Sequence, residues 1–286
     1  MNTQSPSAVP AIDDWSKLLS NRIAVVTGGG SDGIGGAISR LFAEHGAIVE
    51  IAEIDEERAE RCRSQISEHG GAARAHVVDV TDQQGVSDFA DDVLGRHGRI
   101  DVLVNNVGDY RPLVRFDKSG PESWQKIYEL NLLHFFLVTR AFLPSMIERH
   151  RGSIVNVHSV EGMRGYAGDP VYGAMKAGVA HFTTCLAANV GRRGVRVNGI
   201  GPDLTQTPQV DYISGYEDYD HLWECWAPAG RLGWPEDQAR VALFLASDAS
   251  SFITGHNIPV DGGTKAGAGW FFSRAEHRFV NRPKAL

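Results

Sequence analysis

Two kinds of segment alternate along this chain, and this alternation restricts its possible folds more than any other feature. Short runs rich in β-branched residues predict strands at 22–28, 47–53, 74–80, 100–106, 152–159, 194–200 and 256–263. Helical periodicity between them predicts helices at 35–45, 55–69, 82–97, 121–149, 170–191 and 235–246. The strand segments are almost continuously apolar, as expected when helices cover both faces of a parallel sheet. The alternation therefore predicts an α/β fold with a doubly wound parallel sheet of about seven strands.

No linker and no change of composition divides the segment 21–263, so we expect it to fold as one domain. Hydrophobic residues make up 42% of the 286 residues, which is enough for a sizeable core. Residues 1–20 resemble a polar tail, because they lack the apolar stretch of a signal peptide and Lys17 is their only basic residue.

Charge and cysteine content argue against several kinds of partner. The net charge is −7, whereas a nucleic-acid surface needs clustered positive charge. The chain has no run of 18 apolar residues, so we expect no membrane span. Cys62, Cys185 and Cys225 are widely spaced and match no metal-binding motif. We therefore expect a cytoplasmic protein without a metal site, whose ligand is a small molecule.

The first predicted strand runs into the glycine-rich stretch "TGGGSDGIGG" at 27–36, and a predicted helix follows. Glycines let the main chain approach a pyrophosphate, and a helix N-terminus offers free N–H groups. Because glycines also make ordinary tight turns, the position of an acid matters. Glu53 ends the second predicted strand about 20 residues further on, where a carboxylate accepts from the ribose hydroxyls of NAD. The Glu53 carboxylate would repel the 2′-phosphate of NADP. Arg58 is nevertheless close enough in sequence to reach such a phosphate. The alternative is that Glu53 is simply a solvated acid at the end of a strand.

Tyr172 and Lys176 lie four positions apart in "VYGAMKAG", just after Asp169 and Pro170, a pair that favours the start of a helix. On that helix the two side chains share one face. A fixed ammonium beside a phenol is expected to lower the pKa of the phenol from about 10, which suits general acid and base catalysis. The same pair is also typical of a packed ring beside a solvated amine.

Three neighbouring features favour catalysis. Ser159 ends the fifth predicted strand, where ligands meet a doubly wound sheet, and can bond a substrate oxygen beside Tyr172. Asn131 lies inside the predicted helix 121–149, where it can distort the helix and hold a water, or simply bond to the main chain. The stretch "NNVG" at 105–108 ends the fourth predicted strand and offers a close approach of the main chain to a ligand.

Together these motifs resemble those of the short-chain dehydrogenase/reductase family in its compact single-domain form, with a Rossmann-type fold. Asn131, Ser159, Tyr172 and Lys176 match the family's Asn-Ser-Tyr-Lys tetrad in order and in spacing, which is 28, 13 and 4 positions. The glycine loop, "VDV", "NNVG" and "IPVDGG" resemble further family motifs. Asp203 departs from the pattern, because a glycine usually follows the proline there.

The resemblance implies a role for each tetrad residue. Tyr172 exchanges a proton with the substrate oxygen, and Lys176 lowers its pKa and holds the nicotinamide ribose. Ser159 orients the substrate oxygen, while Asn131 anchors a water that relays protons. The resemblance implies NAD or NADP as the cofactor, and Glu53 favours NAD. The residues expected to bind it are Gly28, Ser31, Asp32, Gly33, Ile34, Gly35, Glu53, Asp79, Val80, Asn106, Gly108, Tyr172, Lys176, Pro202 and Thr207.

The same resemblance implies that residues 203–234 form a lid over the substrate. Aromatic residues are frequent in this segment. They indicate a hydrophobic substrate, such as an alicyclic, aromatic or steroid-like secondary alcohol or its ketone. They can equally pack the lid onto the body or a neighbouring subunit. The candidate substrate contacts are Tyr110, Glu161, Trp223 and Trp226. His158 should point away from Ser159 along an alternating strand, so we assign it no catalytic role.

Alternative functions are an NADP-dependent ketone reductase and a regulator that binds a dinucleotide without catalysis. An enoyl reductase or a sugar-nucleotide epimerase is disfavoured by the tyrosine–lysine spacing and by the absence of a larger C-terminal domain. The apolar and small residues of helices 121–149 and 170–191 predict a homo-oligomer, with a homotetramer expected from the family. Residues 264–286 form a C-terminal extension whose aromatic and basic residues predict docking, either on an adjacent subunit near its lid or on the same subunit.

Overall fold

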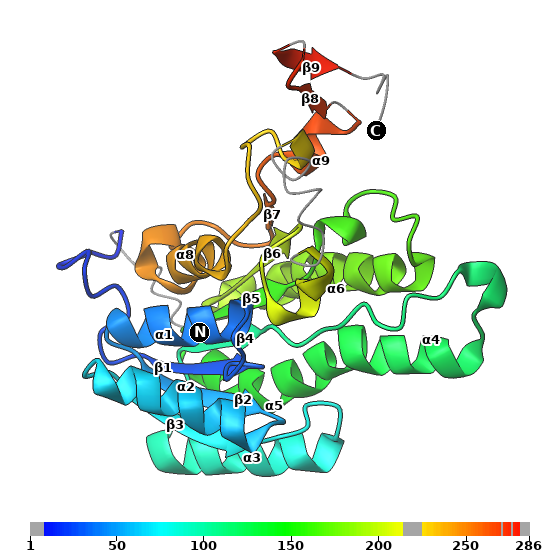
Figure 1. The fold of residues 1–286 in the computed structure, drawn as a ribbon. Coiled ribbons are helices and arrows are strands. Elements are labelled where there is room, and N and C mark those ends of the chain that lie inside the picture. The colour runs from blue at the N-terminus through cyan, green and yellow to red at the C-terminus, as the bar shows by residue number, and fades with distance from the viewer. Residues whose placement is uncertain (1–8, 214–224, 270, 276, 281–286) are drawn as a thin grey trace.

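The computed structural model describes residues 9–213, 225–269, 271–275 and 277–280 (Figure 1). Within them a parallel sheet has the strand order β3-β2-β1-β4-β5-β6-β7. The strands are β1 Ile23–Thr27, β2 Ile48–Glu53, β3 Ala72–Val77, β4 Val102–Asn105, β5 Gly152–Val157, β6 Val195–Pro202 and β7 Asn257–Val260. The order reverses between β1 and β4, which creates the crevice where doubly wound sheets bind ligands. The predicted fold is confirmed.

Helices cover both faces of this sheet (Figure 1). The described α-helices are α1 Ile34–Glu44, α2 Glu56–Glu68, α3 Gln83–His97, α4 Pro121–Tyr128, α5 His134–Glu148, α6 Pro170–Val190, α8 Pro235–Ala246 and, beyond the sheet, α9 Thr264–Gly267. Alternate residues of one strand enter different cores: Val26 packs with α1 and α8, whereas Val25 packs with α3 and α5. Both residues are fully buried, which explains why the strand sequences are continuously apolar.

Several boundaries differ from the sequence prediction, and two of these differences are the most informative. The third strand ends at Val77 rather than at Val80, so "VDV" lies in the loop beyond the strand. The helix expected at 121–149 is interrupted by a π-helical turn at Glu129–Leu133 that separates α4 from α5. Asn131 lies in this turn, where its side-chain amide donates to the main-chain oxygen of Ile127 at 3.1 Å. Local competition of this kind is a physical reason for the interruption.

Among the described helical segments, Pro121–Glu148 is long and apolar enough to cross a membrane by composition, with 28 residues and a mean hydropathy of 1.4. In the structure Val138, Phe142 and Met146 of this segment are buried in the core beneath the sheet. The segment is therefore accounted for as a core helix of the α/β fold.

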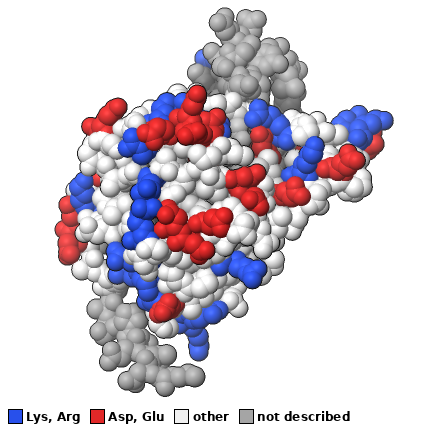
Figure 2. Space-filling model, turned by 90° about the horizontal axis from the view of Figure 1, so that it is seen from below, with Lys and Arg blue, Asp and Glu red and all other residues white. Residues whose placement is uncertain are grey.

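Charged side chains of both signs are interspersed on the face shown in Figure 2. Many pair locally along helices, as Arg63 does with Glu60 and Arg96 with Asp92. Exposed pairs of this type contribute roughly 0–1 kcal/mol each, so they stabilise the fold little.

Beyond β7 the chain forms α9 and then two antiparallel strands, β8 Phe271–Ser273 and β9 Arg278–Val280. Figure 1 shows this hairpin standing well away from the central sheet. Trp270, one of the aromatic residues of the extension 264–286, lies outside the described residues. Docking of the extension on a second subunit stays a prediction.

Candidate active site

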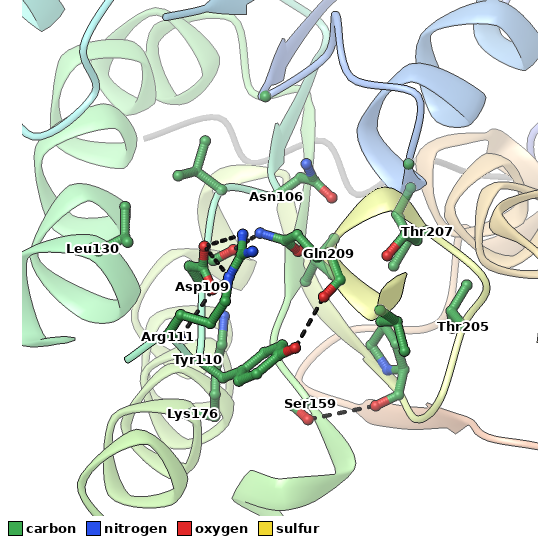
Figure 3. A pocket seen from close by; sticks show the side chains of 18 of the residues that line it. Asn106, Asp109, Tyr110, Arg111, Leu130, Ser159, Lys176, Thr205, Thr207 and Gln209 are labelled. Atoms are coloured by element: carbon green, nitrogen blue, oxygen red, sulfur yellow. Dashed lines mark hydrogen bonds and ion pairs between the residues drawn. The ribbon is translucent and has the colours of Figure 1, made fainter. Parts of the chain in front are cut away.

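A cleft of about 1080 Å³ lies at the carboxyl ends of the strands. Its lining comes from the segments that follow β1, β2, β3, β4, β5 and β6. Figure 3 shows Asn106, Ser159, Lys176 and Thr207, which come from different segments, arranged around this one hollow. The cleft therefore occupies the crevice that the strand order creates.

The glycine-rich loop closes tightly on the start of α1. Gly28 has φ +62, and a Cβ at Gly35 would lie only 2.2 Å from the Gly28 carbonyl oxygen. Gly35 thus lies behind the loop rather than on the cleft surface, and a larger residue there would push the loop away. No side chain caps α1, so the first N–H groups of this helix are available where Gly33 and Ile34 line the cleft.

Glu53 ends β2 with only 4% of its surface exposed. Its Oε1 accepts from the N–H of Ile54 at 3.1 Å and from the Arg58 guanidinium at 2.9 Å. Both Glu53 and Arg58 line the cleft. Arg58, which the sequence left as a possible phosphate ligand, therefore partly neutralises Glu53 here. Asp32 is more exposed and pairs with Arg61 at 2.8 Å.

The other predicted cofactor residues also border the cleft. They are Gly28, Ser31, Asp79, Val80, Asn106, Gly108, Pro202 and Thr207. The Asn106 amide donates to the Thr27 oxygen at 3.1 Å, which ties the loop after β4 to the end of β1. The uncapped helix start, the glycines and the buried acid together form a cradle that fits a dinucleotide.

Lys176 and Asn131 meet above the main chain of Gly108. A Cβ at Gly108 would lie 2.5 Å from Lys176 Nζ and 3.0 Å from Asn131 Oδ1, so a larger residue here would displace the ammonium group. The Lys176 Nζ lies 5.6 Å from the centre of the Tyr172 ring. The N-cap Asp169 fixes the start of α6 by accepting from the N–H of Tyr172 at 3.3 Å.

The Asn131 side chain is fully buried and bonded to the main chain. It accepts from the N–H of Asp109 at 3.2 Å and donates to the Asp109 oxygen at 2.8 Å. Asn131 therefore holds the loop after β4 in place, whatever part it has in proton relay.

Ser159 follows β5 and is held by two loops. Its Oγ accepts from the N–H of Glu161 at 3.1 Å and donates to the Pro202 oxygen at 3.5 Å (Figure 3). Tyr172 lines the same cleft, and Ser159 acts to lower the pKa of its phenol. Two hydroxyl-bearing side chains therefore border this part of the cleft.

The expected pKa of Tyr172 is corrected by the structure. Burial raises its pKa well above the usual range, while Ser159 acts in the opposite direction. Burial also lowers the pKa of Lys176 to about 8, against the attraction of Asp109. Burial therefore outweighs the expected effect of the lysine, because both groups are desolvated together. Tyr172 is therefore held as a phenol, ready to donate a proton.

Three of the four residues predicted to contact the substrate lie in the described part of the chain, and each lines the cleft. The Tyr110 hydroxyl donates to the Gln209 oxygen at 2.9 Å and links the loop after β4 to the segment after β6 (Figure 3). Glu161 binds Arg164 at 2.7 Å, and Trp226 lines the cleft. Trp223 lies outside the described residues.

Sequence reasoning missed several residues that line the wall of the cleft beside Tyr172. Tyr166 packs edge-on to Tyr172 with 6.0 Å between ring centres, and Arg164 lines the cleft beside it. Both lie between Ser159 and Tyr172 in sequence, and that position is the one signal that could have indicated them. His158 is buried with its ring beside Gly199 and Gly201, and burial lowers its pKa to about 4.

The chain is similar to several known proteins along most of its length. A family model described as enoyl-(acyl carrier protein) reductase matches residues 29–265. The chain is 40% identical to the 3-oxoacyl-(acyl carrier protein) reductase of Chlamydia muridarum over 249 residues, 87% of this chain and 99% of that protein. It is 37% identical to cis-4-hydroxycyclohexanecarboxylate dehydrogenase of Sinomonas cyclohexanicum over 250 residues, again 87% and 99%. The structure of 7α-hydroxysteroid dehydrogenase with NADH and 7-oxo glycochenodeoxycholic acid gives a TM-score of 0.81 at 32% identity, over 88% of this chain and 98% of that one.

Proposed function

The chain belongs to the short-chain dehydrogenase/reductase family and is an oxidoreductase, and we propose that it interconverts a secondary alcohol and the matching ketone with NAD. The observation that carries this proposal is the meeting of Ser159, Tyr172 and Lys176 in the cleft that also holds the glycine loop and Glu53. Hydroxyl donors beside a dinucleotide cradle suit carbonyl chemistry.

In this proposal each residue acts on the substrate oxygen or on the cofactor. Tyr172 donates its hydroxyl proton to the ketone oxygen in reduction and accepts the alcohol proton in oxidation. Ser159 orients that oxygen, and Lys176 bonds the nicotinamide ribose and replaces the proton that Tyr172 gives up. A bound NAD would supply the hydride acceptor for oxidation at the substrate carbon, and its reduced form would supply the hydride for reduction.

The proposed substrate is a ring-bearing molecule that also carries a polar substituent. Leu113, Leu204 and Val210 line the cleft and favour a hydrophobic ring, whereas Glu161 and Arg164 favour a polar group beside it. Two relatives support this class, because their names specify a hydroxycyclohexane carboxylate and a bile-acid ketone.

A substrate panel tests the function. We expect NAD-dependent oxidation of at least one of cyclohexanol, 4-hydroxycyclohexanecarboxylate and a hydroxysteroid, measured by the absorbance of reduced nicotinamide. Binding of NAD without turnover of any alcohol or matching ketone would favour a regulator instead. Reduction of an enoyl thioester but of no ketone would favour the reaction named in the matching family model.

Glu53 is proposed to set the preference for NAD over NADP. We expect Glu53→Ala to raise the ratio of kcat/KM for NADP to that for NAD by about 10- to 100-fold, the size of a charge-assisted hydrogen bond. The variant removes the carboxylate and at the same time releases Arg58, which now binds it, for a 2′-phosphate. Steady-state kinetics with both cofactors measure the ratio. Glu57→Ala is the matched control, since Glu57 is an exposed glutamate in the first turn of α2, next to Arg58. A wild-type enzyme that already prefers NADP would contradict this role.

We also propose a homotetramer, which is common in this family. Support comes from Phe136 on α5 and Phe182 on α6, which pack edge-on at 4.8 Å while staying partly exposed. Light scattering should give four times the chain mass of 31.1 kDa, and a stable monomer would contradict the proposal.

A further inference from the structure

Asp203 is the point beside the active site where separate segments of the chain meet. It follows Pro202 in sequence, and its side chain is 8% exposed. Its Oδ2 accepts from the Arg164 guanidinium at 3.1 Å, from the Trp226 indole at 3.4 Å and from the Thr264 hydroxyl. These donors come from the loop after β5, from the far end of the expected lid and from the first residue of α9.

The Asp203 carboxylate is largely buried and is satisfied by several hydrogen-bond donors. A buried carboxylate is tolerated only where donors satisfy it, and here three donors reach one oxygen. Although burial works to lower it, the bonds and charges of Glu161 and Asp203 raise the pKa of Arg164, so the guanidinium stays charged. A glycine at position 203 would leave all three donors without this acceptor.

The contacts of Asp203 lead to Ser159 by two routes. The first is along the chain, because the Pro202 oxygen accepts from the Ser159 hydroxyl at 3.5 Å. The second is through Arg164, which binds both Asp203 and the Glu161 carboxylate. The N–H of Glu161 in turn donates to the Ser159 Oγ at 3.1 Å. Both main-chain groups that hold Ser159 therefore belong to residues tied to Asp203.

We propose that Asp203 is a positioning residue that fastens the C-terminal extension, through Thr264, to the wall of the substrate site and thereby fixes Ser159. Thr264 is the link to the extension, because it is the first residue of α9 and is 8% exposed. The proposal concerns the extension of the same subunit. Its kinetic part rests on the proposed function, whereas the attachment of the extension is measurable without a substrate.

The first test measures attachment by limited trypsin digestion at Lys265, the residue next to Thr264. We expect Asp203→Asn and Thr264→Val to be cleaved there about tenfold faster than the wild type, because each weakens a hydrogen bond to a charged group. Thr264→Ser, which keeps the hydroxyl, should be cleaved at the wild-type rate. Asp248→Asn is the matched control: Asp248 also joins separate segments of the chain, through Arg22 and Arg151, but it does not line the cleft. Cleavage at the wild-type rate in both test variants overturns the proposal.

The second test measures kinetics with an alcohol that the wild type oxidises. Thr264→Val is expected to lower kcat by about tenfold and to leave the KM for NAD within about twofold, and Thr264→Ser should restore kcat. Thermal unfolding identifies any variant that fails to fold. Faster cleavage with unchanged kcat overturns the link to Ser159. A wild type that oxidises no alcohol overturns the proposed function and this kinetic part together, and the trypsin result still decides the attachment.

Discussion

Tyr172→Phe is expected to lower kcat by about 10²- to 10⁴-fold, the usual contribution of a general acid or base. The substitution removes the hydroxyl that is proposed to share the substrate oxygen with Ser159. It keeps the ring, which packs edge-on against Tyr166 at 6.0 Å, so the wall of the site should survive. Affinity for NAD should stay nearly unchanged, and titration of reduced nicotinamide fluorescence measures it.

The control for this experiment is the second tyrosine of the pair. Tyr166→Phe removes a phenolic hydroxyl from the same cleft, yet the proposed mechanism gives Tyr166 no part in proton transfer. We expect its kcat to remain within about tenfold of the wild type. A Tyr172→Phe enzyme that works at the wild-type rate would disprove the catalytic assignment. Equal losses of kcat in both variants would indicate that the two tyrosines only support the packing of the site.

Lys176→Met should lower kcat by about 10²-fold and weaken NAD binding by about tenfold. The two losses have one cause, because the buried Nζ lies 5.6 Å from the Tyr172 ring and close to the main chain of Gly108 on the cofactor side. Kinetics and cofactor titration measure them separately. Loss of kcat with unchanged NAD affinity would remove the role of Lys176 at the ribose.

The same variant should stabilise the cofactor-free protein. Burial lowers the pKa of Lys176 to about 8 from a model-compound value of 10.5. Below pH 8 the folded protein therefore carries a buried charge that the unfolded chain keeps solvated, which costs about 3 kcal/mol. Between pH 8 and 10.5 the folded state has already lost this proton, so the cost shrinks as the pH rises. Lys176→Met should have the higher Tm at pH 7, and the gap should narrow toward pH 10.

An exposed lysine provides the comparison for this stability experiment. Lys126 is exposed on α4, so Lys126→Met should leave Tm nearly unchanged at either pH. A Lys176→Met protein that is less stable than the wild type at pH 7 would contradict the buried-charge argument. It would indicate that the aliphatic stem and the ammonium together stabilise the fold.

Much of the architecture could be predicted, because its causes are local in sequence. The continuous apolar runs follow from two covered sheet faces, as the opposite packing of Val25 and Val26 shows. The end of β3 was wrong by three residues, since "VDV" is as β-branched as a strand but lies beyond the last strand pairing. For Asn131 the sequence left open a distorted helix or a plain bond to the main chain, and the structure shows both, because the amide competes for main-chain groups.

The sequence by itself determined the sheet, the glycine loop and the presence of a tyrosine and a lysine on one helix face, because each depends on residues close together in the chain. Only the tertiary structure decided the ionisation of Tyr172, since its pKa depends on burial by distant segments rather than on the lysine one turn away. The partners of Asp203 were likewise decided by folding. Arg164, Trp226 and Thr264 lie 39, 23 and 61 positions from it and meet it only once the strands have brought their loops to one edge of the sheet.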